Sequence, residues 1–291
     1  MRMQHIKTMC KEAIEDLIAA VEAGKSETLV RYLKTMARFH HYSVSNQILI
    51  YSQKPNASRV AGFHTWRKLG RHVKKGERGI AIMAPVVYRK RNEFINAKAM
   101  MDEKQPTEED SEETIRTFKA VYVFDINQTK GKDLPEFASV EGEPEEHLDK
   151  LKSLIQSRDI TLEYSKYLGG AEGASSGGHI AIKDGLRPAE EFSVLVHELA
   201  HEMLHQNPEG RETSKKIKET EAEAVAFVVS QGIGIQAKQA SSDYINLYNG
   251  SRKTLLESLE RIQSTASEIL DGLADNYSNT VESTPRTAAA A

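Results

Sequence analysis

Cysteine is almost absent from this 291-residue chain, in which Cys10 is the only one. A single cysteine excludes a disulfide framework and zinc modules built from cysteine pairs, and it is typical of a reducing cytoplasm. Long apolar runs are also missing, because no stretch approaches the roughly 20 residues that a membrane helix needs. Glu12, Glu15 and Asp16 lie where a signal peptide would have its apolar core. We therefore expect a cytoplasmic protein with no membrane partner, whose metal sites, if any, use histidines and carboxylates.

Acidic residues are nearly missing from one part of the chain. Residues 28–90 contain 13 lysines and arginines and one acid, Glu77, although the whole chain has a net charge of −3. Hydrophobic residues make up 39% and charged residues 28%, which is a globular composition, and the length allows two domains. The uneven charge indicates that the two parts of the chain do different work.

Hydrophobic periodicity and turn residues predict an α+β protein of two domains. The first is a small, basic, mixed α/β module over residues 1–132. A polar, acidic segment at 133–145 reads as a linker, and it could act as a tether. The second domain, at 146–276, is mainly helical, and residues 277–291 are expected to be disordered. The acidic run at 102–113 is a solvated loop or, alternatively, a short DNA mimic. Helices are expected over residues 3–24, 26–38, 44–53, 145–157 and 242–274 and around the histidines at 197–205, and strands over 79–88, 117–129 and 179–182.

The segment VLVHELAHEMLHQ contains the HExxH arrangement. Residues four apart share one face of a helix, so His197 and His201 can bind the same ion. Glu198, next to the first ligand, can reach a water molecule beside that ion and act as the catalytic base. The alternative is a charged helix face packed on a core helix that happens to carry histidines.

Catalytic zinc needs a third protein ligand and an open position. The segment ETEAEAV begins 18 residues after His201, on what we expect to be the next helix. Glu219 and Glu223 share a face of that helix, whereas Glu221 points away from it. We choose Glu219 as the ligand, because the spacing resembles the gluzincin pattern in which the first acid binds the metal. Glu223 is then expected to hydrogen-bond a ligating histidine.

Three further residues near this motif have open assignments. His205 lies one turn beyond the metal ligands, where it supports them or faces solvent. Tyr244, Tyr248 and His205 are each candidates for stabilising an oxyanion, and the sequence does not choose among them.

Aromatic residues are interspersed with the cations of the basic segment, including Phe63 and the only tryptophan, Trp66. Cations neutralise phosphates and exposed aromatic rings stack on unpaired bases, so this pattern favours single-stranded nucleic acid. The alternative is that Phe63 and Trp66 belong to the core and the cations only solubilise the chain.

Both parts of the chain resemble one family. The segments YSVSNQILI, RVAGFHTWRKLGRHVKKGERGIAIMAP and VFDINQTKG resemble the N-terminal single-stranded-DNA-binding domain of ArdC-type antirestriction proteins. The segments LVHELAHEMLH and KETEAEAVAFVV resemble their C-terminal domain, which is related to the ImmA/IrrE metallopeptidases. The resemblance implies DNA-binding residues at Tyr42, Ser43, Asn46, Trp66, Arg71, Lys74 and Lys75, with Gly70 and Gly76 in the same pattern.

The resemblance also implies a function. We expect an antirestriction protein of plasmids or other mobile elements that binds single-stranded DNA and enters the recipient cell with it during conjugation. Its second domain is expected to be a zinc-dependent peptidase acting on an unknown protein or peptide, with Zn²⁺ or another divalent ion such as Mn²⁺. The strand at 179–182 is expected to pair with an extended substrate. The alternative is a DNA-coating protein without turnover, whose metal site is structural.

Overall fold

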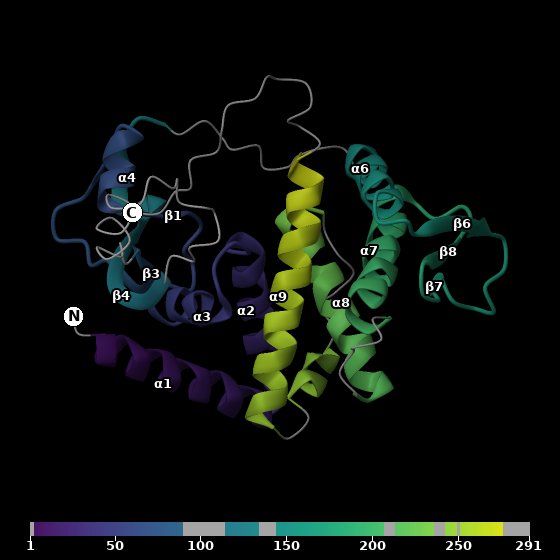
Figure 1. Cartoon of the computed structure of the whole chain (residues 1–291), viewed down its shortest axis with the longest axis horizontal. Coiled ribbons are helices and arrows are strands. Elements are labelled where there is room, and N and C mark those ends of the chain that lie inside the picture. Colours follow the sequence, from purple (N-terminus) through teal and green to yellow (C-terminus); the bar gives the residue numbers. More distant parts are fainter. Residues whose placement is uncertain are drawn as a thin grey trace, which may run out of the picture.

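The computed structural model describes residues 3–89, 114–133, 144–206, 213–235, 242–248 and 251–275 (Figure 1). The acidic run at 102–113, most of the expected linker and the tail at 277–291 lie outside these ranges. The first half contains helices α1 (Met3–Glu22), α2 (Ser26–Arg38), α3 (Val44–Gln53) and α4 (Phe63–Lys68), the 3₁₀ helix η1 (Ile126–Gln128), and strands β1 (Val60–Gly62), β2 (Arg71–Val73), β3 (Ile80–Arg89), β4 (Thr114–Asp125) and β5 (Thr129–Gly131). The second half contains α6 (Pro144–Gln156), β6 (Thr161–Ser165), β7 (Gly173–Ser175), β8 (His179–Lys183), α7 (Pro188–His205), α8 (Lys215–Gly232), η2 (Ser242–Leu247) and α9 (Arg252–Asp275).

The α+β class is confirmed, and the first three helices lie where their periodicity places them. In α1, Ile6, Ile14 and Val21 are buried on one face. The single long helix expected at 242–274 is wrong, because residues 242–247 form 3₁₀ helix and the α-helix begins only at Arg252. Ser251 accepts a hydrogen bond from the Thr254 backbone N–H through its hydroxyl, at 3.4 Å, and so caps the new helix.

The sheets are small. In the first half, β4 lies between β1 and β3, and both of its neighbours are antiparallel to it. Ile80 of β3 pairs with Val123 of β4, and both belong to a small core with Phe39 and Ile50. Strands β2 and β5 form a separate ribbon. In the second half, β8 is central, parallel to β6 and antiparallel to β7.

The main hydrophobic core extends across both halves of the chain. Leu33 of α2, Leu195 of α7, Val228 of α8 and Leu259 of α9 all belong to one buried cluster. Helix α2 packs on α8 and η2, and α9 contacts α3, α6 and α8 (Figure 1). The domain boundaries expected from the sequence therefore do not separate two hydrophobic cores.

No helix in the described part of the chain combines the length and the apolar character that crossing a bilayer requires.

Candidate metal centre

Helix α7 carries the HExxH residues, and its sequence explains why it begins at Pro188. Proline fits the first turn of a helix, and the Glu190 side chain accepts a hydrogen bond from the Arg187 backbone N–H at 3.4 Å, which completes a cap. Leu195 and Leu199 are fully buried in the core. This burial fixes the rotation of the helix and places His197 and His201 on the face toward α8.

Three side chains converge where the sequence predicts a metal. The Nε2 atoms of His197 and His201 are 3.1 Å apart, and Glu219 Oε2 of α8 lies 3.6 and 3.5 Å from them. Ligands held at 2.0–2.1 Å around a tetrahedral ion are about 3.3–3.4 Å from one another. The donor set therefore fits a divalent cation without rearrangement of either helix.

Both histidines favour the neutral form that a metal requires. Burial lowers the pKa of His197 to about 4, with a further contribution from His201, while Glu219 acts in the opposite direction. Burial also lowers the pKa of His201. Neutral imidazoles offer lone pairs, so the site is prepared for metal at neutral pH.

Glu198 is only 7% exposed and faces strand β7. A Cβ atom on Gly173 would lie 2.8 Å from Glu198 Oε1, so only glycine allows this strand to approach the carboxylate. Burial raises the pKa of Glu198, and a hydrogen bond with the Ser175 side chain lowers it. The carboxylate is thus held in place beside the histidines, in surroundings that make it a better proton acceptor.

A cavity of about 390 Å³ opens beside these residues. Its lining includes Gly173, His197, Glu198, Glu219 and Glu223, together with Phe227 and Tyr244.

The three candidates for stabilising an oxyanion differ in their position relative to this cavity. Tyr244 lines the cavity. The hydroxyl of Tyr248 donates to Glu22 instead. The Nε2 atom of His205 lies 3.1 Å from the Lys218 carbonyl oxygen. Of the three candidates, Tyr244 is therefore the one that borders the cavity, although its side chain is almost fully buried.

Glu221 is a buried acidic residue close to the metal ligands, and nothing in the sequence indicated its burial. It is fully buried and accepts a hydrogen bond from Ser258 at 2.6 Å. Its Oε2 atom lies 3.8 Å from His205 Nε2 and 3.7 Å from Arg261 Nε. Glu221 thus joins α7, α8 and α9 behind the metal ligands, consistent with its expected position off the metal face.

The expected DNA-stacking role of Trp66 is wrong. Its ring is 2% exposed and its indole N–H donates to the Phe124 carbonyl at 2.8 Å, so no base can reach it. Asn46 is also occupied, because its side-chain amide makes two hydrogen bonds with the backbone of Met83, at 2.8 and 2.9 Å. Ser43 caps α3. These residues build the fold of the first half.

The remaining candidates for DNA binding differ in how far other contacts within the protein already occupy their side chains. The Arg71 guanidinium donates to Thr129 Oγ1 at 2.8 Å and to the Lys132 carbonyl at 2.5 Å, and Lys74 Nζ donates to a backbone carbonyl at 2.9 Å. Tyr42 is half-buried and packs edge-on against the Phe39 ring. Lys75 is exposed in the turn that Gly76 forms with its positive φ of 88°. Lys75 is therefore the candidate best placed to meet a phosphate.

Comparison with known proteins gives matches for both halves. The N-terminal domain of anti-restriction factor ArdC matches residues 7–124, and the IrrE N-terminal-like domain of the M78 peptidases matches residues 148–247. An uncharacterized protein of Bacillus anthracis is 27% identical over 308 residues, a match that covers 92% of this chain and 52% of that protein. The chain thus spans about half the length of this relative.

Two solved structures share the fold. The metal-free crystal structure of the antirestriction protein ArdC from plasmid R388 has a TM-score of 0.52 at 16% identity, and covers 91% of this chain and 98% of its own. The Mn(II)-bound structure of that protein has a TM-score of 0.55 at 17% identity, with 93% and 98% covered.

The fold and the site define an α+β protein with a metallopeptidase-like HExxH domain. More specifically, residues 7–124 match the N-terminal domain of the anti-restriction factor ArdC, and this domain precedes an IrrE-like domain of the M78 peptidases at residues 148–247.

Proposed function

We propose that this chain binds single-stranded DNA with its first half and hydrolyses peptide bonds at a divalent-metal site in its second half. Through these two activities it would protect incoming DNA from restriction. The observation that carries the peptidase part is the convergence of His197, His201 and Glu219 at 3.1–3.6 Å beside the buried Glu198, on an open cavity.

The roles of the residues follow from their positions. His197, His201 and Glu219 would hold the ion, with Zn²⁺ or Mn²⁺ as candidates. A divalent ion there supplies Lewis acidity, which polarises the scissile carbonyl and makes a water molecule more acidic. Glu198 takes the proton of that water on a carboxylate oxygen and passes it to the leaving amine. Its burial keeps the carboxylate in one orientation and raises its affinity for the proton.

The expected pairing of substrate with the strand at 179–182 is wrong, because that strand, β8, is already paired on both sides. Strand β7 is at the edge of the sheet, and its Gly173 lines the cavity. We therefore place an extended substrate beside β7, where backbone hydrogen bonds would align it with Glu198.

The DNA part of the proposal is supported by the basic segment at 28–90 and by exposed aromatic rings in the same half. Phe63, Phe118 and Tyr122 are 44%, 57% and 43% exposed. Exposed rings can stack on unpaired bases, which the buried Trp66 cannot do.

The decisive experiment compares the wild type with Glu198→Gln, each loaded with Mn²⁺ or Zn²⁺, on a peptide library analysed by mass spectrometry. The glutamine keeps the shape of the side chain but cannot accept the proton. We expect cleavage by the wild type, none by the variant, and equal metal content. Glu163→Gln, on an exposed residue of β6, is the control and should cleave normally.

Transfer of a plasmid into restricting and non-restricting recipients then tests the biological role. Loss of protection with Glu198→Gln supports a hydrolytic contribution. Absence of cleavage by the wild type together with full protection by the variant would leave DNA coating with a structural metal site.

A further inference from the structure

A second group of metal-ligating side chains lies outside the HExxH site. His40 and His41 follow α2, and Asp271 lies near the end of α9. One ring nitrogen from each histidine and a carboxylate oxygen of Asp271 all lie within 4.8 Å of one another. The group shares no residue and no helix face with the HExxH site.

His40 is held in the manner of a metal-binding histidine. Its Nδ1 atom lies 3.2 Å from the Ala37 carbonyl oxygen, which can only accept a hydrogen bond, so Nδ1 carries the proton. The lone pair is then on Nε2. A hydrogen bond from the other ring nitrogen to a backbone carbonyl is the usual way in which ligating histidines are oriented.

Electrostatics also favour lone pairs over protons at His40. Burial lowers the pKa of His40, and the neighbouring His41 lowers it further, whereas the Ala37 hydrogen bond and Asp271 act in the opposite direction. The two imidazole rings are 3.9 Å apart between centroids, so two cationic rings would repel each other strongly. An ion bound through one ring nitrogen of each histidine takes the place of those protons.

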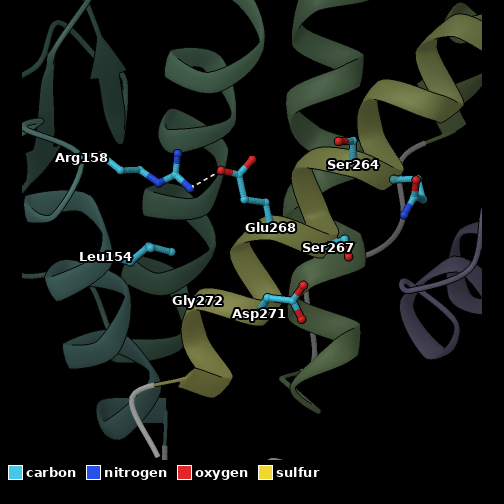
Figure 2. Close-up of a pocket in the computed structure, with 8 residues that line it drawn as sticks. Leu154, Arg158, Ser264, Ser267, Glu268, Asp271 and Gly272 are labelled. Carbon is cyan, nitrogen blue, oxygen red and sulfur yellow. Dashed lines mark hydrogen bonds and ion pairs between the residues drawn. The ribbon is translucent and has the colours of Figure 1, made fainter. Parts of the chain in front are cut away.

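The carboxylate of Asp271 is placed for the same ion. Its Oδ1 atom lies 3.7 Å from His41 Nδ1, and both side chains are accessible, at 51% and 66% exposure. Figure 2 shows Glu268, one turn earlier on α9, directed toward Arg158, while Asp271 points away from that pair. Because Arg158 and Glu268 are already joined at 2.6 Å, Asp271 does not take part in their ion pair.

A hydrogen bond joins the histidine turn to the helix that carries Asp271. Gln263 of α9 donates through Nε2 to the His40 carbonyl at 2.5 Å, which fixes the histidine turn against the helix that carries Asp271. Asp271 also lines a cavity of about 480 Å³ with Ser264 and Ser267 (Figure 2). The exposure of the His41 and Asp271 side chains lets water molecules complete the coordination of a metal with three protein ligands.

We propose that His40, His41 and Asp271 form a second cation site that binds a divalent transition metal. Two imidazoles and one carboxylate suit Zn²⁺, Ni²⁺ or Cu²⁺ better than Mg²⁺ or Ca²⁺, which prefer oxygen ligands alone. An ion at this place connects the end of α2 in the first half to α9 in the second. Because it binds only the folded chain, it stabilises the packing of the two halves.

The test uses the full chain without an affinity tag, in a His197→Ala/His201→Ala background that lacks the HExxH site. Calorimetric titration with Ni²⁺, repeated with Zn²⁺, should give about one ion per chain. Adding His41→Gln and Asp271→Asn should weaken binding at least 30-fold. The matched control is His179→Gln with Glu163→Gln, a histidine–carboxylate pair at 3.4 Å that has no third ligand among the described residues, and it should leave binding unchanged.

The wild-type background provides a second measurement in case the double alanine variant does not fold. Elemental analysis after dialysis against micromolar Zn²⁺ should give two ions for the wild type and one for His41→Gln/Asp271→Asn. Binding at millimolar concentration only, or an equal second ion in the wild type and this variant, would overturn the proposal. Neither result would affect the HExxH site, which is tested separately.

Discussion

The site residues predicted in the two halves of the molecule differ in whether the structure leaves them available for a ligand. At the metal centre, His197, His201 and Glu219 come from two helices and meet within 3.6 Å. In the basic first half, Trp66 is buried and Asn46 is hydrogen-bonded to backbone. A motif whose spacing is set by the geometry of one ion predicts side chains that converge in the fold. A family pattern over a folded module also includes the residues that build the module.

The largest change in a measured property is expected on substitution of a proposed metal ligand. His201→Ala removes one of three protein donors, so affinity for Zn²⁺ or Mn²⁺ at the HExxH site should fall at least 100-fold. The chain should keep its helical circular dichroism signal. Calorimetric titration in the His41→Gln/Asp271→Asn background isolates this site. Unchanged affinity there would refute the ligand assignment.

Trp66→Ala should act on stability rather than directly on DNA. Removing a buried aromatic ring from a packed core costs about 3–5 kcal/mol, and the Phe124 carbonyl also loses its donor. Urea denaturation measures this loss. The matched control is Phe63→Ala, because Phe63 belongs to the same helix and is 44% exposed. This substitution should lower the free energy of unfolding by less than about 1 kcal/mol. Comparable losses in both variants would contradict the placement of Trp66.

Gly173→Ala tests the close approach of β7 to the Glu198 carboxylate. Its methyl group would lie 2.8 Å from Glu198 Oε1 and 2.7 Å from a Val194 methyl, so either β7 or Glu198 must shift. We expect peptide cleavage to fall roughly 10–100-fold, because small displacements of catalytic groups are costly, while metal content is unchanged. Gly177→Ala lies in the adjacent turn with open space around it and separates backbone strain from this contact. A larger loss in Gly177→Ala would point to strain instead.

The buried histidines predict acid sensitivity of the metal-free protein. Burial, followed by the effect of His201, lowers the pKa of His205 to about 4, below its ordinary 6.5. The unfolded chain then binds more protons between these values, so the stability is complete above pH 6.5 and is lost as the pH falls toward 4. His205 should account for about 1–3 kcal/mol of this loss.

This sensitivity is measured by urea denaturation in chelator at pH 7 and pH 4.5. His205→Gln should show a smaller difference between the two pH values than the wild type. Equal differences would indicate that His205 is protonated in both the folded and the unfolded chain.

The smallest effect is expected at Lys75, the exposed cation of the DNA-binding candidates. Lys75→Ala should weaken binding of single-stranded oligonucleotides by a few-fold and reduce the slope of log K against log salt by about 0.7. Fluorescence anisotropy at several salt concentrations measures both. Lys183→Ala, an exposed lysine of the second half, should change neither. An unchanged slope in Lys75→Ala would place the DNA elsewhere.

The sequence predicted the first three helices and the shared face of His197 and His201 well, because both depend on local spacing. It did not predict β7, because Gly173 lies in a glycine-rich stretch typical of loops, and its role depends on contact with Val194 and Glu198 of the later helix α7. The burial of Glu221 was equally hidden, since its partners Ser258 and Arg261 belong to α9. Residue spacing alone does not reveal which polar residues the rest of the fold will cover.

The core that extends from α2 to α9 has a consequence for how such a chain can be inherited. Recombination that replaced one half with a foreign counterpart would bring together two apolar surfaces that had not been selected to match. The halves are therefore expected to change together, and the unit that recombination can exchange is the whole chain. For the same reason, a backbone cut between residues 133 and 144 would leave two pieces that remain associated.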